Sequence, residues 1–239
     1  MDIQQGTIVI TGASDGIGKE IALALAKRHA SLALLGRNMD RLHAVEESVK
    51  AMGGNVKKYV CDVQSSKQIA DVVKQIEADF QGKIIGLVNN AGIWQKKATL
   101  ENISDEEIKN VLEIDLGGVI AMTKALLPTL KKQPEAAIVN ISSRSGITAQ
   151  PNQSVYTAAK WGVKGFTEVL KEDLKESSVH VAGVYQGGTN TQMFNKVGEG
   201  FSEEKLNSFI PAASLGEVIA YILELPKQIW LSEVHVENR

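Results

Sequence analysis

The stretch that decides the fold reads "TIVITGASDGIG" and spans residues 7–18. Its first part, "TIVIT" (7–11), is continuously apolar and rich in β-branched residues, which is typical of a buried strand. Its second part, "TGASDGIG" (11–18), leads into a segment with apolar residues at helical spacing, so we expect a helix over 16–29. A strand, a glycine-rich turn and a helix therefore begin the chain.

The glycines of this turn indicate a phosphate site. Gly12, Gly16 and Gly18 allow the backbone to turn sharply and to approach a ligand where a Cβ would block it. The start of the helix offers free N–H groups and a positive dipole end. The spacing differs from the common G-x-G-x-x-G fingerprint and could belong to a plain tight turn. Its place in the first strand–helix unit favours a nucleotide site.

The same alternation of strand and helix continues along the chain. Because parallel strands need helical crossovers, it predicts an α/β protein with a parallel sheet. A (β/α)₈ barrel would need eight strands, and we count seven. We therefore expect one domain over 1–239 with a Rossmann fold, a doubly wound seven-stranded parallel sheet with helices on both faces. The expected strands are 7–11, 31–36, 56–62, 84–90, 136–142, 179–185 and 229–236, and the expected helices are 16–29, 39–52, 65–80, 104–130, 155–176 and 214–224.

Composition excludes several classes of partner. The 239 residues carry a net charge of −2, which gives no reason to expect nucleic acid or an acidic membrane as partner. No apolar run reaches the length of a membrane span. The single cysteine, Cys61, cannot form an internal disulfide, and a strand begins too early for a signal peptide. We expect a cytoplasmic protein.

The segment 186–212 breaks the regular alternation. It is too long for an ordinary connection, and such loops commonly act as lids. Its glycines and its apolar residues Met193, Phe194 and Phe201, which we expect to be exposed, suit a lid that closes over an apolar ligand. A mobile surface excursion is the alternative.

The end of the second strand selects between nicotinamide cofactors. An acidic residue there would bond the ribose 2′-hydroxyl and favour NAD. The chain has "LLGRN" (34–38) instead, and the guanidinium of Arg37 would pair with a 2′-phosphate. We therefore expect NADP(H) in preference to NAD(H). The alternative is that Arg37 only caps a loop.

Taken together, the motifs resemble the short-chain dehydrogenase/reductase family over essentially the whole chain. Within that family, the sequence resembles NADP-dependent 3-oxoacyl-carrier-protein reductases and related carbonyl reductases. The motifs that carry the resemblance, in chain order, are "TGASDGIG" (11–18), "CDV" (61–63), "NNAG" (89–92), "NISS" (140–143), "YTAAK" (156–160) and "GGTNT" (187–191).

The resemblance implies a set of cofactor-binding residues. Asp62 would contact the adenine amino group, Val63 would flank that ring, and Thr191 would meet the nicotinamide carboxamide. The segment 89–92 would line the adenosine side. The full implied set, with the residues of the glycine turn and the second strand, is Gly12, Ser14, Asp15, Gly16, Ile17, Gly18, Arg37, Asn38, Asp62, Val63, Asn89, Ala91, Gly92, Tyr156, Lys160, Gly187, Thr189 and Thr191.

Tyr156 and Lys160 are the expected catalytic pair. Residues four apart share a helix face, and here that face continues in apolar residues, so Tyr156 should point inward. A nearby ammonium favours tyrosinate and lowers the tyrosine pKa toward neutrality, as a general acid/base requires. The resemblance implies that Ser143, 13 positions before Tyr156, bonds the substrate carbonyl, with Ser142 as the alternative. Lysine at the margin of an apolar face could also extend to water.

Two positions depart from the family pattern. Asp115 stands where an asparagine usually helps anchor a proton-relaying water, so we count it among the catalytic residues. A carboxylate can pair with Lys160 and partly offset its effect on Tyr156. Gln186 replaces the usual proline before glycine and gains a side chain that could reach substrate, although it could equally be a neutral loop variation.

These expectations combine into a functional hypothesis. The chain is expected to be an enzyme that transfers hydride between NADP(H) and a ketone or aldehyde, or the corresponding secondary alcohol, with no metal. The alternatives are the oxidative direction and a catalytically weak NADP(H)-binding sensor or scaffold. Family resemblance suggests a homodimer or homotetramer packed through 104–130 and 155–176. The expected pocket walls are Trp94, Gln95, Arg144, Gln186, Met193 and Phe194.

Overall fold

The computed structural model describes residues 1–239 as alternating strands and helices. The strands are β1 Thr7–Thr11, β2 Ser31–Gly36, β3 Val56–Val60, β4 Ile84–Asn89, β5 Ala136–Ile141, β6 Val179–Gln186, β7 Thr189–Asn190, β8 Ile210–Pro211 and β9 Glu233–Val236. The helices are α1 Gly16–Ala26, α2 Met39–Ala51, α3 Ser66–Asp79, α4 Asp105–Leu112, α5 Gly118–Leu130, α6 Ser154–Leu174, α7 Glu203–Asn207 and α8 Ala212–Glu224.

Seven of the strands form one parallel sheet in the order β3-β2-β1-β4-β5-β6-β9. The strand order reverses between β1 and β4, so the loops at their carboxyl ends diverge and leave a crevice there. The expected doubly wound, seven-stranded sheet is confirmed. The glycine turn follows β1 and opens onto this crevice.

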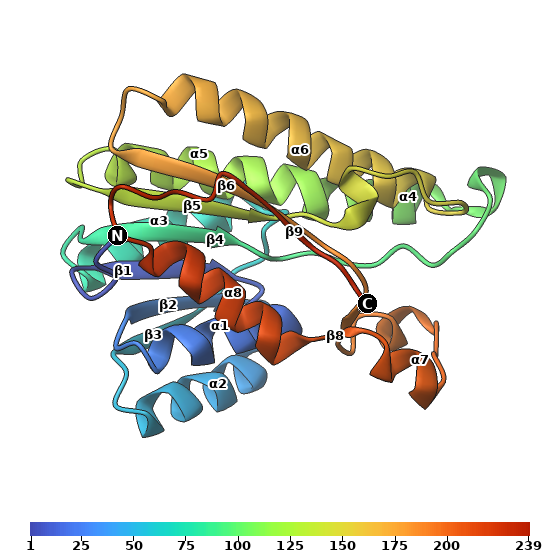
Figure 1. Cartoon of the computed structure of the whole chain (residues 1–239), viewed down its shortest axis with the longest axis horizontal. Coiled ribbons are helices and arrows are strands. Elements are labelled where there is room, and N and C mark those ends of the chain that lie inside the picture. The colour runs from blue at the N-terminus through green and yellow to red at the C-terminus, as the bar shows by residue number, and fades with distance from the viewer.

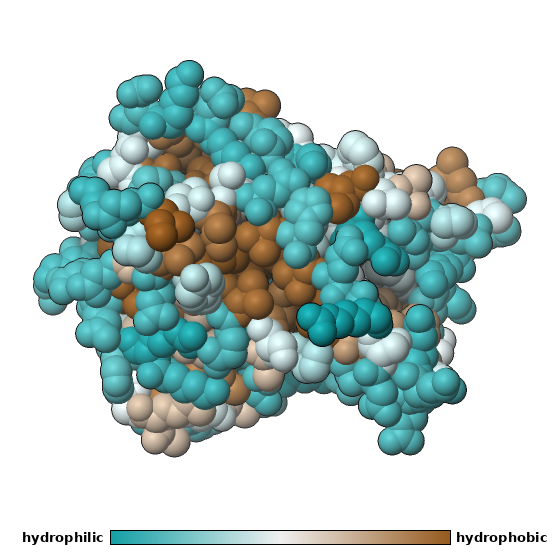
Figure 2. All heavy atoms as spheres, in the orientation of Figure 1, coloured by the Kyte–Doolittle hydropathy of each residue, from teal (hydrophilic) through white to brown (hydrophobic).

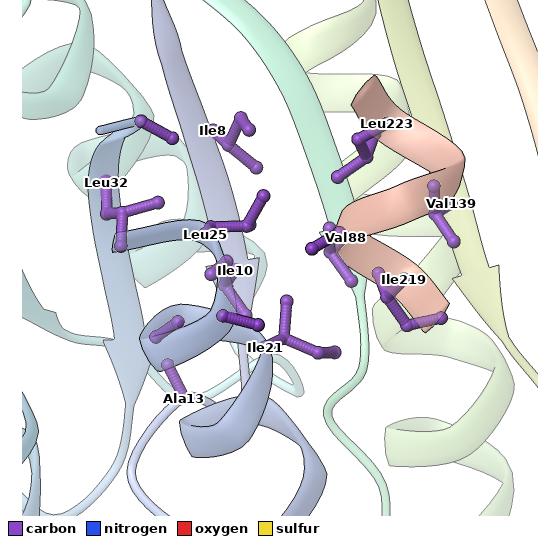
Figure 3. Packing of buried hydrophobic residues seen from close by; sticks show 14 of the residues in the cluster. Ile8, Ile10, Ala13, Ile21, Leu25, Leu32, Val88, Val139, Ile219 and Leu223 are labelled. Atoms are coloured by element: carbon purple, nitrogen blue, oxygen red, sulfur yellow. The ribbon is translucent and has the colours of Figure 1, made fainter. Parts of the chain in front are cut away.

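Alternation along the strands divides the core between the two faces of the sheet. Ile8 and Ile10 of β1 pack against α1, α2 and α8, whereas Val9 packs on the other face with α3, α5 and α6. Figure 3 shows the first of these layers, in which Ile21 of α1 and Ile219 of α8 lie over the sheet. Figure 1 shows the two helical layers on opposite sides. Both faces are covered, as apolar strands without polar alternation require.

Most elements begin and end within three residues of the expected ranges, and two differ by more. The last strand begins at Glu233, not 229, because the indole N–H of Trp230 donates to the carbonyl of Val181 at 2.9 Å and takes a place that a strand amide would hold. The expected helix 104–130 is interrupted by a π-helical turn, Glu113–Gly117, between α4 and α5. That turn contains Asp115.

The segment after β6 folds into short elements of its own. The strands β7 and β8 form a two-stranded parallel sheet, and α7 lies in the chain segment that connects them. In Figure 1 this unit lies beside the carboxyl end of the large sheet, near the C-terminus of the chain. No helix has both the length and the apolar character of a membrane span.

Candidate active site

A cavity of about 790 Å³ lies at the carboxyl ends of the strands. It runs from the glycine turn after β1 to the segment after β6, and so includes the crevice at the point where the strand order reverses. Nearly all residues that the sequence assigned to a cofactor line it. These residues are Gly12, Ser14, Asp15, Gly16, Ile17, Arg37, Asn38, Asp62, Val63, Ala91, Gly92, Tyr156, Lys160, Gly187, Thr189 and Thr191.

The glycine turn has the geometry of a phosphate cradle. Gly12 has a φ of +65°, and a Cβ there would lie 2.8 Å from the Cα of Ala91. The backbone N–H of Ile17, in the first turn of α1, has no acceptor within the chain. Asp15 caps the same helix by accepting from the N–H of Gly16 at 2.7 Å. The turn thus presents a free amide and a helix dipole to the cavity, which suits a phosphate.

Two residues of the predicted cofactor set do not line the cavity. Gly18 instead allows helix and turn to meet, since a Cβ there would lie 2.3 Å from the carbonyl oxygen of Gly12. Asn89 was also expected to bind cofactor, and this expectation is wrong for its side chain. Its amide donates to Thr123 at 2.9 Å and to Asn140 at 2.8 Å within the buried core. As the last residue of β4, it faces inward with the strand.

The neighbouring Asn90 has the position that sequence reasoning missed. Its side-chain amide donates to the carbonyls of Thr11 at 3.0 Å and Gly12 at 3.2 Å, and it lines the cavity. It therefore ties the end of β4 to the glycine turn. The two consecutive asparagines pointed to this site in the sequence. Which of them reaches the glycine turn depends on where β4 ends, and the sequence pattern does not fix that residue.

Arg37 and Asn38 lie at the far end of the cavity, after β2. Arg37 is exposed, lines the cavity and forms no salt bridge. Asn38 is the N-cap of α2 and accepts from the N–H of Arg41 at 2.9 Å. The loop cap is thus supplied by Asn38, which leaves the guanidinium of Arg37 available to a ligand. Asp62 and Val63 lie nearby, after β3.

Tyr156 and Lys160 lie on one buried face of α6, as the spacing predicts. Each is 5% exposed, and the Lys160 ammonium lies 5.5 Å from the centre of the Tyr156 ring. The backbone N–H of Tyr156 donates to the side chain of Gln95 at 2.9 Å. Gln95 therefore completes the open first turn of α6. It does not line the cavity, so the expectation that it forms a pocket wall is wrong.

Asp115 lies directly behind Lys160. The π-helical turn directs its fully buried carboxylate toward the lysine, and the ammonium lies 3.1 Å from one oxygen. The other oxygen accepts from the backbone N–H of Ile93 at 2.8 Å. Asp115 does not line the cavity, so it contacts Lys160 and not the space in which a substrate would lie. Pairing with Lys160 is confirmed.

Burial and charge act together on these three groups. Burial has the largest effect on Tyr156 and raises its pKa, and Asp115 raises it further. Lys160 and the Ser143 hydroxyl lower it, but the net pKa stays above the ordinary value. Burial lowers the pKa of Lys160, but Asp115 and Tyr156 raise it above its ordinary value. Burial raises the pKa of Asp115 against the opposing effect of Lys160. Burial outweighs Lys160, so the expected lowering of the Tyr156 pKa toward neutrality is not found, and Tyr156 keeps its proton at neutral pH.

The two candidate serines have different environments. The Ser142 hydroxyl donates to the backbone carbonyl of Lys160 at 3.2 Å and is buried. Both serines line the cavity, but only the Ser143 hydroxyl is close enough to lower the pKa of Tyr156. This arrangement favours Ser143 over Ser142 as the group that meets a ligand. Arg144 follows on the surface and also lines the cavity.

The segment 186–212 closes the other side of the cavity. Gln186 lines the cavity, and its side-chain oxygen is buried without a hydrogen-bond partner. Thr191 approaches the glycine turn, since a Cβ on Gly16 would lie 3.3 Å from its methyl group. Met193 is half-buried. The expected exposure of Phe194 is wrong: it is only 9% exposed because it packs within an aromatic cluster.

Comparison with known proteins agrees with this geometry. The family model described as "short chain dehydrogenase" matches residues 6–201. The chain belongs to this family. A 3-oxoacyl-[acyl-carrier-protein] reductase of Thermotoga maritima is 33% identical over 91% of the chain and 87% of that relative.

Solved structures of the family extend the likeness to the whole fold. An alcohol dehydrogenase of the archaeon Thermococcus sibiricus, complexed with 5-hydroxy-NADP, has a TM-score of 0.88 at 28% identity over 97% of this chain and 95% of that one. A metagenomic short-chain oxidoreductase in complex with NADP has a TM-score of 0.85 at 28% identity over 100% of both chains. The chain is thus an oxidoreductase of the short-chain dehydrogenase family.

Several residues of this short-chain dehydrogenase site were missed at the sequence level. The Glu199 carboxylate accepts from the indole of Trp94 at 2.9 Å and from the N–H of Lys97 at 2.6 Å. Asn238 donates to the carbonyls of Gly188 at 3.0 Å and Ser208 at 2.8 Å. These bonds join segments that are far apart in the chain, so no local sequence pattern could predict them.

Proposed function

We propose that the chain is an NADPH-dependent carbonyl reductase in which Tyr156 is the general acid. The observation that supports this most strongly is the buried Tyr156–Lys160–Asp115 arrangement beside Ser143, at the inner end of a cavity that begins at a phosphate cradle. Reduction of a ketone or aldehyde needs a proton donor beside the carbonyl oxygen. Tyr156, whose pKa lies above the ordinary value so that it is protonated at neutral pH, would be that donor.

The residues of the cavity fit a nicotinamide dinucleotide. The free amide of Ile17 and the helix dipole would hold the pyrophosphate. Asp62 and Val63 would hold the adenine end, and Thr191 with Lys160 would hold the nicotinamide end. The reduced cofactor supplies the hydride, while the chain orients the reactants and moves the proton.

The proton step uses three side chains of the chain itself. The Ser143 hydroxyl would donate a hydrogen bond to the carbonyl oxygen and hold it beside Tyr156. The Tyr156 hydroxyl would give its proton to that oxygen as the carbon becomes tetrahedral. The Lys160 ammonium would stabilise the resulting tyrosinate.

Asp115 acts through Lys160, as a positioning residue. Its carboxylate holds the buried ammonium in one place and raises its pKa. The same negative charge raises the pKa of Tyr156. Relative to the asparagine usual in the family, Asp115 would therefore favour the protonated tyrosine and hence the reductive half of the cycle.

The segment 186–212 would act as a lid. Lys196 reaches across to Asp15 at the glycine turn, with 3.0 Å between ammonium and carboxylate. Glu199 binds the loop that carries Trp94. These bonds join the segment 186–212 to the loops of the large sheet. They are few enough to break and re-form as ligands enter and leave.

Cofactor preference is tested by thermal unfolding with NADPH and with NADH at equal millimolar concentrations. A ligand at about 100 times its Kd adds about 2.7 kcal/mol, or about 5–10 °C in Tm at this length. We expect the larger shift with NADPH. Arg37→Ala should abolish the difference by removing the charge that meets the 2′-phosphate. The control is Lys67→Ala, an exposed residue outside the cavity. A larger shift with NADH would refute the assignment of Arg37.

A homodimer or homotetramer would cover apolar residues left on the helical surface. Leu112, Ile120, Trp161 and Val169 are exposed on α4, α5 and α6. Apolar residues also gather in the middle of the face that carries α8 (Figure 2). Tyr221 of α8 is exposed. Patches of this kind mark interaction surfaces.

A charged substitution on the surface formed by α4, α5 and α6 tests whether that surface is the interface of the oligomer. Trp161→Glu should convert the oligomer into a smaller species, because it would bury a carboxylate without a partner. Light scattering coupled to size exclusion measures the mass of both forms. Tyr221→Glu on α8 is the matched comparison. If Tyr221→Glu dissociates the protein and Trp161→Glu does not, the interface lies on the α8 face instead.

A further inference from the structure

The charge lining the cavity is opposite to that of the whole chain. The protein has 26 basic and 28 acidic residues and a net charge of −2. Eight basic and two acidic residues line the cavity. A cleft lined by one sign of charge attracts ligands of the other sign. The basic residues are Arg37, Arg41, Lys97, Arg144, Lys160, Lys196, Lys205 and Arg239, and the acidic ones are Asp15 and Asp62.

Part of this charge is already neutralised or assigned to the cofactor. Arg41 and Lys196 pair with Asp15, and Lys160 pairs with Asp115. Arg37 is assigned above to the 2′-phosphate. The other basic residues of the lining have no such partner or role.

Three of the remaining basic residues share a second property. Lys97, Arg144 and Lys205 form no salt bridge although all three line the cavity. The lid does carry a carboxylate close to Lys97, but its two oxygens accept from the Trp94 indole and from the backbone N–H of Lys97. The side-chain ammonium of Lys97 is left free.

Aromatic rings form a wall that runs from Tyr156 toward Lys97 and Lys205. Trp94 lies 4.8 Å from Tyr156 and 4.9 Å from Phe194, measured between ring centres. Phe201 lies 5.0 Å from Phe194 and 5.2 Å from Phe209. All of these residues line the cavity. A wall of edge-to-face rings beside the proton donor suits a flat apolar body.

The free lysines lie against the outer rings of this wall. The Lys97 ammonium is 5.9 Å from the centre of the Phe201 ring, and that of Lys205 is 5.7 Å from the Phe209 ring. Each ammonium is thereby held next to the apolar wall while remaining open to a ligand. The order along the cavity is proton donor, aromatic wall, cations.

On the basis of the proposed function, we propose that the substrate is a ring-containing apolar ketone, or its alcohol, that carries an anionic group. The carbonyl lies at Tyr156, the ring lies against Trp94 and Phe194, and the anion meets Lys97 and Lys205. Arg144, an exposed cation that also lines the cavity, adds to the attraction. A neutral ketone of the same shape would leave these cations without a partner.

Four ketones test ring and charge separately. They are 4-acetylbenzoate and its neutral isostere 4-acetylbenzamide, and the open-chain pair 4-oxopentanoate and 4-oxopentanamide. NADPH oxidation with each gives kcat/KM. We expect kcat/KM for 4-acetylbenzoate to be about tenfold higher than for 4-acetylbenzamide, which is the effect of two partly exposed ion pairs. It should also be higher than kcat/KM for 4-oxopentanoate. Because the cations are exposed, the preference for the acid should shrink in 0.5 M salt, where the Debye length is about 4 Å.

Variants assign the preference to residues. In Lys97→Met/Lys205→Met, the acid-to-amide ratio should fall to about one. Lys96→Met is the matched control, because Lys96 is exposed beside Lys97 but does not line the cavity. Equal rates for acid and amide, a ratio that survives the double substitution, or preference for the open-chain acid would each overturn the inference. So would reduction of other neutral carbonyls with none of the four ketones accepted. No turnover of any carbonyl, with NADPH bound, would refute the proposed function instead.

Discussion

Tyr156→Phe is expected to leave a folded protein that binds NADPH and reduces its carbonyl substrate about 10²–10⁴-fold more slowly. The substitution removes only the hydroxyl that would donate the proton. The ring keeps its place, because it packs 4.8 Å from Trp94 and its backbone N–H remains bonded to Gln95. The measurements are kcat with saturating NADPH and the Tm shift that NADPH produces.

Tyr185→Phe is the matched control for this prediction. Tyr185 is also buried, lies outside the cavity and has a hydroxyl without a hydrogen-bond partner. Its loss should leave turnover unchanged. If Tyr156→Phe retained full turnover, the assignment of the general acid would be wrong. If the wild type has no turnover and Tyr156→Phe keeps its biological role, the chain is a cofactor-binding sensor or scaffold.

The sheet could be predicted from local sequence, because its strands are continuously apolar and each is followed by a helix. The strand that was placed wrongly, 229–236, shows the limit of this reasoning. Its first residues are as apolar as those of β2, but there the Trp230 side chain bonds the carbonyl of Val181 in place of the backbone. Competition between a side chain and a backbone donor depends on the neighbouring strand, which sequence periodicity does not report.

The site was predictable where a motif fixes both residue and orientation. Tyr156 and Lys160 share a helix face by spacing alone. Asn89 and Asn90 differ only in which one ends the strand, so the motif could not assign the side chains correctly. Phe194 was expected to be exposed because it lies in an irregular segment. It is buried because it packs in an aromatic cluster with Trp94, which lies 100 positions away in the chain. The burial of Phe194 therefore depends on long-range packing, which a local sequence pattern does not report.

Asp115 should matter for stability through the charge that it leaves behind. Asp115→Leu removes one member of a buried ion pair, and an unpaired buried lysine costs about 3–5 kcal/mol in the free energy of unfolding. Asp115→Asn should cost less, because the amide oxygen still accepts from the N–H of Ile93. Chemical denaturation at neutral pH measures both. The double variant Asp115→Leu/Lys160→Met should lose less than the two single changes together, since no charge remains unpaired.

The pH dependence of Asp115→Asn separates positioning from mere support of the fold. The Asp115 carboxylate raises the pKa of Tyr156, so the amide should lower it. Reduction needs the protonated tyrosine, and its rate falls as pH rises through that pKa, so this falling limb should move to lower pH. Oxidation of the alcohol needs tyrosinate, so its rising limb should also move to lower pH. A purely structural role would reduce the rate at every pH alike. Profiles that keep the wild-type midpoint in both directions would show that Asp115 does not act on Tyr156.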